Sequence, residues 1–430
     1  MRTAAPRDHR SSRRATRWLT GLSVLPLSAT VALGAGLPAT AAPVDPLAPP
    51  PCTTEVRQLP VNEFTSHAEL GRELRRLQAV SHGRLTVSEI GRSNRGREIW
   101  AATVGTGEKV VLLNAEIHGN EKVGPDAVLR VLEQLATSDD AWTERLLASV
   151  TVVAVPKLNV DGAELDRRGN DRTWAEVVAE FPQLAAGQPA WNYIQRVQQG
   201  DDYVTAPGFD LNRDFHADLD HVPDPADLPG APEGFGWFLN PESQALRDLY
   251  VDLQGRYDGV DGFLDIHHQG ACVARDDTGE LIDVAVDYPP LPEQEFEPGG
   301  KYAPYRNMQD ASRQLAISAF NGIERAGYLP VRYGHAPERD LPGQARSAFA
   351  LNGTRTVLFE IRGQTQTLGQ AGRERFTRAT VAGIEQMLAD LATGAVDRLD
   401  PRAYDTLPDS VQLTPDGRVV PDDQVGTEVD

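Results

Sequence analysis

Four side chains in this sequence are able to bind a metal ion or transfer a proton. His118 and Glu121 lie three residues apart in the stretch NAEIHGNE, so both can reach one ion if the backbone turns sharply between them. His267 follows in LDIHHQG, and Glu360 in LFEIRG. A catalytic zinc ion takes three protein ligands and keeps one position for water or substrate. His118, Glu121 and His267 are therefore predicted to bind one Zn²⁺ per chain.

Glu360 is predicted to act as the general acid/base of such a site. Zinc lowers the pKa of its bound water towards ~7 and polarises a carbonyl. A separate carboxylate must then take the proton of the water and pass it to the leaving nitrogen. Glu360, on an otherwise apolar predicted strand, has the placement for this role.

Each of these side chains ends a predicted strand, directly follows one or opens the next helix. The continuous apolar runs at 109–117 and 150–159 are typical of strands that are covered on both faces. The segments 260–268 and 353–363 are predicted to be strands as well. Ligands of open α/β sheets bind at the carboxyl ends of the strands. The four side chains are therefore expected to meet at one edge of a sheet.

The remaining pattern alternates strands with helices. A helix is predicted at 66–80, where Ser66 is the N-cap and Glu69 completes an S-x-x-E capping box. Further strands are predicted at 85–91 and 97–105, and further helices at 124–136, 307–327 and 372–392. This alternation favours an α/β fold, a single domain with a mixed, mainly parallel central sheet flanked by helices. The irregular stretches 215–241 and 285–305 are predicted to be loops around a site or surface insertions.

The two ends of the chain differ from its middle. Residues 1–41 begin with six arginines, continue with an apolar stretch and end in small residues, which is the pattern of a secretory signal peptide. A Pro-rich leader at 42–54 follows, then a predicted catalytic domain at 55–395. The acidic tail at 396–430 is predicted to be extended or partly disordered. The protein is therefore expected to be secreted and extracellular, with no membrane attachment after signal cleavage.

The acidic charge limits the classes of partner. The formal net charge is −20, and removal of residues 1–41 takes it to −25, because this segment carries six arginines against Asp8. Binding to nucleic acid or to an anionic membrane through a general basic surface is not expected. Cys52 and Cys272 are the two cysteines. In an exported protein they permit one disulfide, with two buried free thiols as the alternative.

The order of these motifs resembles that of the zinc carboxypeptidases of the carboxypeptidase A type, as a secreted, bacterial-like member. The resemblance spans residues 55–395 and rests on six segments in order, IGRSNRGREIW, HGNE, LNVDG, GFDLNRDF, LDIHHQG and LFEIRG. HGNE has the H-x-x-E form of the family's metal loop, LDIHHQG matches the third ligand, and LFEIRG matches the strand of the general base.

The resemblance implies roles for further residues. Asn212 and Arg213 are expected to bind the terminal carboxylate of the substrate, with a planar two-pronged contact from the arginine. A further arginine is expected to polarise the scissile carbonyl and to hold the oxyanion. Arg168 is favoured for this role, with Arg172 as the alternative.

Two neighbours of His267 lie on opposite faces of its predicted strand. Asp265 shares the face of His267, since strand side chains alternate, and is a candidate to orient the imidazole. His268 points to the other face and is not expected to be a ligand.

The cleft is expected to differ from the family's pattern. The segment between Arg168 and GFDLNRDF is longer than usual and should reshape the mouth of the cleft. Many members have a tyrosine over the substrate, but none lies between Tyr333 and Glu360 here. Either Arg346 or Phe349 takes its place, or there is no such lid.

Specificity stays open at this stage. Asp340 lies in the stretch that forms the pocket floor of related enzymes, where an acid would mark a preference for basic side chains. The position of Asp340 relative to the pocket does not follow from the sequence.

The predicted function is that of a secreted zinc metallocarboxypeptidase that hydrolyses C-terminal peptide bonds. The alternative is another amide hydrolase on the same fold, either a peptidase for γ-D-glutamyl or diaminopimelate bonds of peptidoglycan stem peptides or an acyl-amino-acid deacylase. A zinc-retaining binding protein without turnover is a third reading. Retention of Glu360 beside all three ligands argues against it, because a pure binder has no need of the base.

Overall fold

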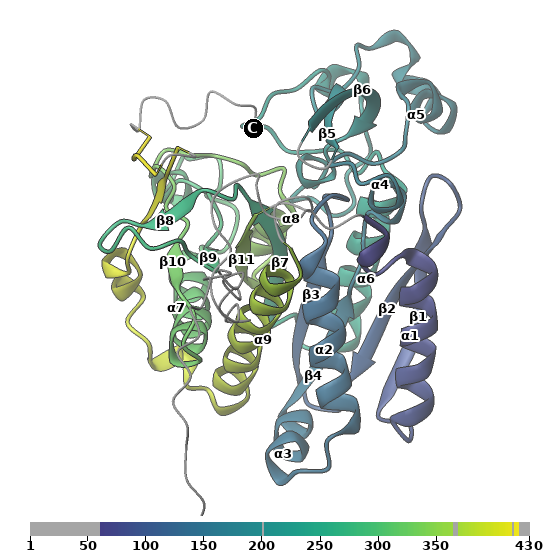
Figure 1. Ribbon diagram of the computed structural model, residues 1–430. Helices are drawn as coiled ribbons and strands as arrows, with labels where there is room; N and C mark the ends of the chain where they lie inside the picture. The colour runs from purple at the N-terminus through teal and green to yellow at the C-terminus, as the bar shows by residue number, and fades with distance from the viewer. Residues whose placement is uncertain (1–60, 200–201, 364–368, 415–416, 421–430) are drawn as a thin grey trace, which may run out of the picture. The chain divides into compact units, whose positions relative to one another are not determined.

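A mixed sheet of eight strands forms the centre of the fold (Figure 1). The structure is a computed structural model and describes residues 61–199, 202–363, 369–414 and 417–420, all within one compact unit. Across the sheet the strand order is β1-β2-β4-β3-β7-β11-β9-β10. The strands are β1 (Leu85–Arg92), β2 (Glu98–Val104), β3 (Lys109–Ala115), β4 (Val150–Val155), β7 (Gly262–Gln269), β9 (Val284–Asp287), β10 (Pro330–Arg332) and β11 (Arg355–Arg362).

The middle of this sheet is parallel. β4 pairs with β3, β3 with β7, and β7 with β11, all in parallel. β9 and β10 are parallel to each other, whereas the pairs β1–β2, β2–β4 and β9–β11 are antiparallel. The carboxyl ends of β3, β7 and β11 therefore meet at one edge of the sheet, where ligands of open α/β sheets bind.

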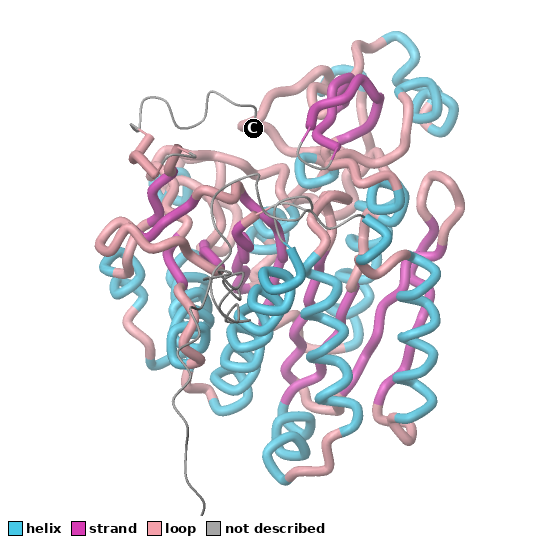
Figure 2. The backbone as a smooth tube through the Cα atoms, in the orientation of Figure 1, coloured by secondary structure: helices cyan, strands magenta, loops and turns pink. Residues whose placement is uncertain are grey.

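Helices cover both faces of the sheet (Figures 1 and 2). Val111 and Leu113 of β3 join the apolar cluster of one face, and Val110 and Leu112 join that of the other, which explains the continuous apolar run. On the first face lie α1 (His67–Val80), α2 (Val123–Thr137), α3 (Ala141–Ser149), α7 (Gln309–Arg325) and α9 (Gly369–Thr393). On the second lie α6 (Pro241–Arg256) and α8 (Ala345–Leu351).

These elements confirm the predicted α/β fold. The Ser66 hydroxyl accepts a hydrogen bond from the backbone of Glu69, and the Glu69 carboxylate accepts one from the backbone of Ser66, so the capping box of α1 is complete. α2 begins at Val123 with Pro125 in its first turn, where a missing N–H costs nothing.

The long segment before GFDLNRDF folds into an ordered layer of its own. It contains α5 (Trp174–Glu180) and the hairpin of β5 (Tyr193–Gln199) and β6 (Asp202–Phe209), and α4 (Val160–Glu164) precedes it. In Figure 1 this layer lies beyond the end of β3. A small apolar cluster stabilises the layer, formed by Val177, Leu184, Ala190, Phe209, Trp237 and Leu239.

The C-terminal segment differs from its prediction. β12 (Ser410–Gln412) pairs with β8 (Val273–Arg275), and Tyr404 is buried and donates to Val286 O at 3.0 Å. Leu399 and Leu407 pack against the main apolar cluster. The prediction of an extended or partly disordered tail is therefore wrong for residues 396–412, because a few apolar side chains anchor this polar segment to the domain.

Several predictions concern residues outside the described part of the chain. The signal peptide at 1–41, the leader at 42–54 and Cys52 all lie there, so these segments and a Cys52–Cys272 disulfide stay predictions. Among the described residues, none of the helices combines the length and the apolar character that a bilayer crossing requires.

Candidate metal centre and cleft

His118 and Glu121 lie on the tight loop that joins β3 to α2. Both side chains are buried, and His118 Nδ1 lies 2.9 Å from Glu121 Oε1. The turn depends on Gly119, whose N–H donates to Arg168 O at 3.3 Å. A Cβ at Gly119 would lie 2.2 Å from the carbonyl carbon of Gly162. Only glycine allows this approach of two backbones.

His267 and Glu360 lie side by side on neighbouring strands. They are register partners in the parallel pair β7–β11, so both side chains project from the same face of the sheet. Asp265 lies one step earlier on that face and is the register partner of Asn114 on β3. Asn114 Nδ2 donates to Asp265 Oδ1 at 2.8 Å, which fixes the carboxylate.

The three predicted ligands converge. His267 Nδ1 lies 3.1 Å from His118 Nδ1 and 3.0 Å from Glu121 Oε2. One donor atom from each of the three residues lies within 4.8 Å of the others. Two imidazole nitrogens and a carboxylate are the donor set of catalytic zinc sites. The residues therefore fit a zinc ion, held by both Nδ1 atoms and Glu121.

Each imidazole has a carboxylate at its second nitrogen. His118 Nε2 lies 3.1 Å from Asp210 Oδ1, and His267 Nε2 lies 3.0 Å from Asp265 Oδ2. Such partners fix the ring orientation and leave the other nitrogen for the metal. Asp265 lies where the sequence predicted, whereas Asp210 was not predicted. Its signal was its position in GFDLNRDF, directly before the segment of expected substrate-binding residues.

Carboxylates and imidazoles shift one another's pKa values in this centre. Burial would lower the pKa of His267, but the carboxylates of Asp265 and Glu121 raise it to about 10. Burial would raise the pKa of Glu121, but the imidazoles of His118 and His267 outweigh this and hold it below its ordinary value. Carboxylates arranged around two imidazoles form an environment that suits a divalent cation.

Glu360 has the environment of a proton-transfer group. Burial raises its pKa to about 8, while His267 lowers it and Glu121 raises it further. Its Oε2 atom is buried and accepts no hydrogen bond from the residues described. A half-buried glutamate whose buried carboxyl oxygen has no hydrogen-bond partner among the described residues, beside a metal centre, suits a general acid/base.

Arg168 is brought to this centre, and Arg172 is not. The guanidinium of Arg168 lies 3.1 Å from Asp210 Oδ2 and 3.9 Å from Glu121 Oε1. Arg172 is buried and donates to Leu239 O at 2.6 Å and to Glu180 Oε2 at 2.5 Å. The alternative assignment, in which Arg172 contacts the substrate and polarises its carbonyl, is therefore wrong, because Leu239 and Glu180 hold this guanidinium. Arg172 ties α5 to the segment that precedes α6.

Asn212 and Arg213 lie in the short 3-10 helix Leu211–Arg213 after β6. Asn212 Nδ2 lies 3.3 Å from His267 Nε2, and its Oδ1 accepts from the backbone of Ala345 at 3.1 Å. Asn212 thus bridges a metal ligand and the start of α8. Arg213 donates to Asn212 O at 3.0 Å and lines the cleft.

A cavity of about 380 Å³ lies beside the centre and is lined by Arg168, Asp210 and Arg213 on one side. The hairpin and the loop before α8 supply the other walls, among them Ile194, Arg196, Val197, Glu338 and Leu341. The expectation that the long segment reshapes the mouth of the cleft agrees with this arrangement.

Asp340 also lines the cavity, but it is already paired. Its carboxylate lies 2.8 Å from Lys301 Nζ and accepts a hydrogen bond from the Tyr302 hydroxyl. Lys301 therefore neutralises the negative charge of Asp340. This pairing argues against a preference of the cleft for substrates with basic side chains at this position.

Neither residue considered as a substitute for the family's tyrosine lies over the cleft. Arg346 is buried and lies 3.0 Å from Asp287 Oδ2. Phe349 is buried too, and its ring stacks on that of Tyr250 at a centroid distance of 4.0 Å. Both side chains belong to the interior of the domain.

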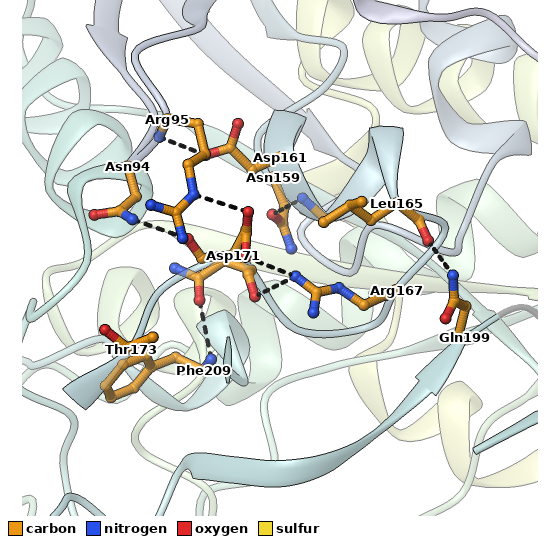
Figure 3. A network of polar contacts seen from close by, with 12 residues as sticks. Asn94, Arg95, Asn159, Asp161, Leu165, Arg167, Asp171, Thr173, Gln199 and Phe209 are labelled. Atoms are coloured by element: carbon orange, nitrogen blue, oxygen red, sulfur yellow. Dashed lines mark hydrogen bonds and ion pairs between the residues drawn. The ribbon is translucent and has the colours of Figure 1, made fainter. Parts of the chain in front are cut away.

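A polar network fixes the backbone next to Arg168 (Figure 3). Arg95, in the turn between β1 and β2, donates from its backbone to Asp161 Oδ2 at 2.8 Å and from Nε to Asp171 Oδ2 at 2.8 Å. Arg167 reaches the same Asp171 carboxylate at 3.1 Å. These contacts join the turn of IGRSNRGREIW and the turn of LNVDG to the segment that contains Arg168. Motifs far apart in the sequence therefore hold this segment together.

Comparison with known proteins agrees with this geometry. Residues 71–278 match the family model described as zinc carboxypeptidase. The match includes the three metal ligands, Arg168, Asn212 and Arg213, and it ends before Glu360, whose assignment rests on its place beside His267.

Solved structures share the fold. Thrombin activatable fibrinolysis inhibitor superposes with a TM-score of 0.53 at 14% identity, over 79% of this chain and 76% of that one. Carboxypeptidase A from Helicoverpa armigera gives a TM-score of 0.51 at 19% identity, over 78% and 76%. The bovine thrombin-activatable fibrinolysis inhibitor, in complex with a tick carboxypeptidase inhibitor, gives 0.51 at 14%, over 79% and 99%.

Proposed function

The chain belongs to the zinc carboxypeptidase family, and on that premise we propose that it is a secreted enzyme that hydrolyses the C-terminal peptide bond of its substrates. One observation carries the proposal. Glu360 Oε2 is buried and has no hydrogen-bond partner among the described residues, and it lies next to the converging ligands His118, Glu121 and His267. A zinc-binding protein without turnover needs the ligands but has no use for this carboxyl group.

Glu360 moves the proton in this proposal. When bound, zinc makes a water molecule more acidic and polarises the substrate carbonyl. Glu360 Oε2 takes the proton of the attacking water and later returns it to the leaving nitrogen. The raised pKa supports this role, because burial makes the carboxylate of Glu360 a stronger base than an ordinary carboxylate.

Arg168 stabilises the developing negative charge on the carbonyl oxygen. Its guanidinium is held by Asp210 and stays partly exposed, with the side chain 28% accessible, so it can face a substrate. A fixed positive charge that needs no reorganisation during the reaction is the usual source of such stabilisation.

Arg213 binds the terminal carboxylate of the substrate. It lines the cavity beside Arg168 and contacts the backbone of Asn212. Asn212 lies beside Arg213 and contacts both His267 and the start of α8.

The proposal is tested on the purified protein with three peptide substrates. The first two share one sequence and differ only in a free C-terminal carboxylate or a C-terminal amide, whereas the third is a peptidoglycan stem peptide. We expect one zinc per chain by elemental analysis, cleavage of the free acid and no cleavage of the amide. A chelator should abolish turnover, and added zinc should restore it. Cleavage of the stem peptide alone would replace the C-terminal peptide substrate with a cell-wall one.

Export is tested separately. We expect the protein in the culture medium when the full chain is expressed, with an N-terminus after residue 41. Retention inside the cell would contradict a signal peptide at 1–41.

A further inference from the structure

A buried ion triad lies under the metal loop. Glu116, Lys122 and Lys157 are all at most 3% exposed. Lys122 Nζ lies 3.1 Å from Glu116 Oε1, and Lys157 Nζ forms an ion pair with Glu116 Oε2. Lys122 Nζ also donates to Ala163 O. None of the three lines the cavity beside the metal centre.

The triad joins the two ends of the loop that carries the ligands. Glu116 directly follows β3 and precedes His118 by two residues, and Lys122 directly follows Glu121. Lys157 extends from the turn after β4, the strand that pairs with β3. One carboxylate therefore ties the start of the loop to its end and to the neighbouring turn.

The backbone of the loop is strained at the same place. Glu116 has a φ of 56°, the left-handed conformation that residues other than glycine rarely adopt. Its carbonyl accepts from Asn159 N at 3.0 Å. A strained residue persists only where its surroundings hold it, and such positions gather at functional sites.

We propose that Glu116 and Lys122 are positioning residues, whose ion pair sets the spacing between His118 and Glu121 and thereby the affinity for the metal. The inference rests on the proposed zinc site. Because no member of the triad reaches the cavity, the effect acts through the ligands and not through contact with the substrate.

The energetics favour a directional contact at this place. Burial lowers the pKa of Lys122, while the nearby Glu116 carboxylate raises it. A buried pair contributes little net stability compared with apolar residues of the same size, but the loss of one partner leaves a costly unpaired charge. The pair therefore fixes geometry more than it adds stability.

The test compares Lys122→Met with Lys157→Met, because each removes one lysine from the triad. Zinc affinity is measured by chelator competition, ligand geometry by the absorption spectrum of the Co²⁺-substituted protein, and stability by the unfolding temperature of the metal-free protein. We expect Lys122→Met to weaken zinc binding by about tenfold or more, as for other groups that orient ligands, and to shift the Co²⁺ bands. Lys157→Met should weaken it less, since the two loop ends stay tied.

Arg375→Met is the matched control. Arg375 forms a buried pair with Asp283, at 2.5 Å, away from the metal centre. The Arg375→Met variant should be less stable than the unchanged protein but have the same zinc affinity and the same Co²⁺ spectrum. Glu116→Gln keeps the shape of its side chain and serves if Lys122→Met does not fold; we expect the same loss of affinity.

Unchanged zinc affinity in both Lys122→Met and Glu116→Gln would overturn the proposal, whatever the stability. Equal losses in Lys122→Met, Lys157→Met and Arg375→Met would overturn it too, since they would mark a general structural effect. Failure of the proposed function would give a different result, because the unchanged protein would then bind no zinc or cleave no peptide.

Discussion

The two sides of the cleft are built in different ways. On the sheet edge, His267 and Glu360 sit on parallel strands that are hydrogen-bonded to neighbours on both sides. On the other side, the hairpin β5–β6 pairs only with itself among the described strands, and Arg196 on it is exposed. The comparison indicates that the two sides of the cleft have different roles. Groups that need exact placement belong to the sheet, and groups that meet a variable substrate belong to the hairpin.

The largest test of the sheet edge is His267→Ala. Loss of one of three ligands should abolish zinc binding and turnover. A ligand present at 1,000 times its Kd stabilises a protein by about 4 kcal/mol, so zinc should raise the unfolding temperature of the unchanged protein and not that of the variant. Calorimetry with and without zinc measures this difference.

The neighbouring residue is the control for that change. His268 is buried, with Nδ1 bonded to Gly363 O at 2.7 Å and Nε2 accepting from Val123 N at 3.2 Å, so it points away from the metal centre. His268→Ala should lose stability and retain zinc. Loss of zinc in both variants would show that the strand as a whole, not the ligand, had been disturbed.

Glu360→Gln tests the proton-transfer step alone. The amide keeps the shape of the side chain but cannot take a proton, so kcat/KM should fall by about 10²–10⁴ with the zinc content unchanged. Steady-state kinetics beside elemental analysis measure both. Full activity in this variant would remove Glu360 from the mechanism.

A smaller effect is expected from pH, through a buried carboxyl group that contacts the segment after Arg168. Glu242 lies at the start of α6 and accepts from Asn170 Nδ2 at 3.2 Å, and burial raises its pKa to about 7 from 4.5. The folded protein therefore holds this proton more tightly than the unfolded chain. The stability that Glu242 contributes is complete below pH 4.5 and is lost as pH rises towards 7, by about 1.4 kcal/mol per pH unit.

Glu242→Gln should remove this part of the pH dependence. Urea unfolding at pH 5 and at pH 7 should show a smaller difference in the free energy of unfolding for the variant than for the unchanged protein. An identical difference in both proteins would mean that Glu242 is ionised in the fold at both pH values.

The smallest effect is expected on the hairpin. Arg196 lines the cavity and is exposed, so Arg196→Gln should change the free energy of unfolding by less than about 0.5 kcal/mol. It should alter KM between peptides that differ in charge near the cleaved bond and leave kcat unchanged. A large loss of kcat would break the comparison, because the hairpin would then take part in the chemistry.

The sequence allowed prediction where one physical signal dominated. β3 and β4 are apolar on both faces because helices cover both, and this made their ends, and hence His118 and Glu121, recognisable. Asp265 followed from strand alternation alone. In each case a local pattern was sufficient to predict the position of the side chain.

Prediction stopped where distant contacts decide. Arg172 and Arg168 lie four residues apart with similar neighbours, and only Leu239 and Glu180, which become adjacent through folding, draw Arg172 inward. β5 is polar and half-exposed, so it lacks the alternation of a strand. Tyr404 reads as part of a polar tail, and its burial depends on Val286 and Asp287, over a hundred residues earlier.

The register of β7 and β11 has a consequence for how such an enzyme can change over time. Because His267 and Glu360 are neighbours through the backbone pairing, their spacing does not depend on the length of the chain between them. That intervening stretch includes α7, α8 and several rim loops of the cleft. Insertions or deletions in those loops can alter which substrates enter while the spacing of ligand and base is inherited intact. Substrate specificity can therefore change in evolution while the residues that carry out the reaction keep their positions.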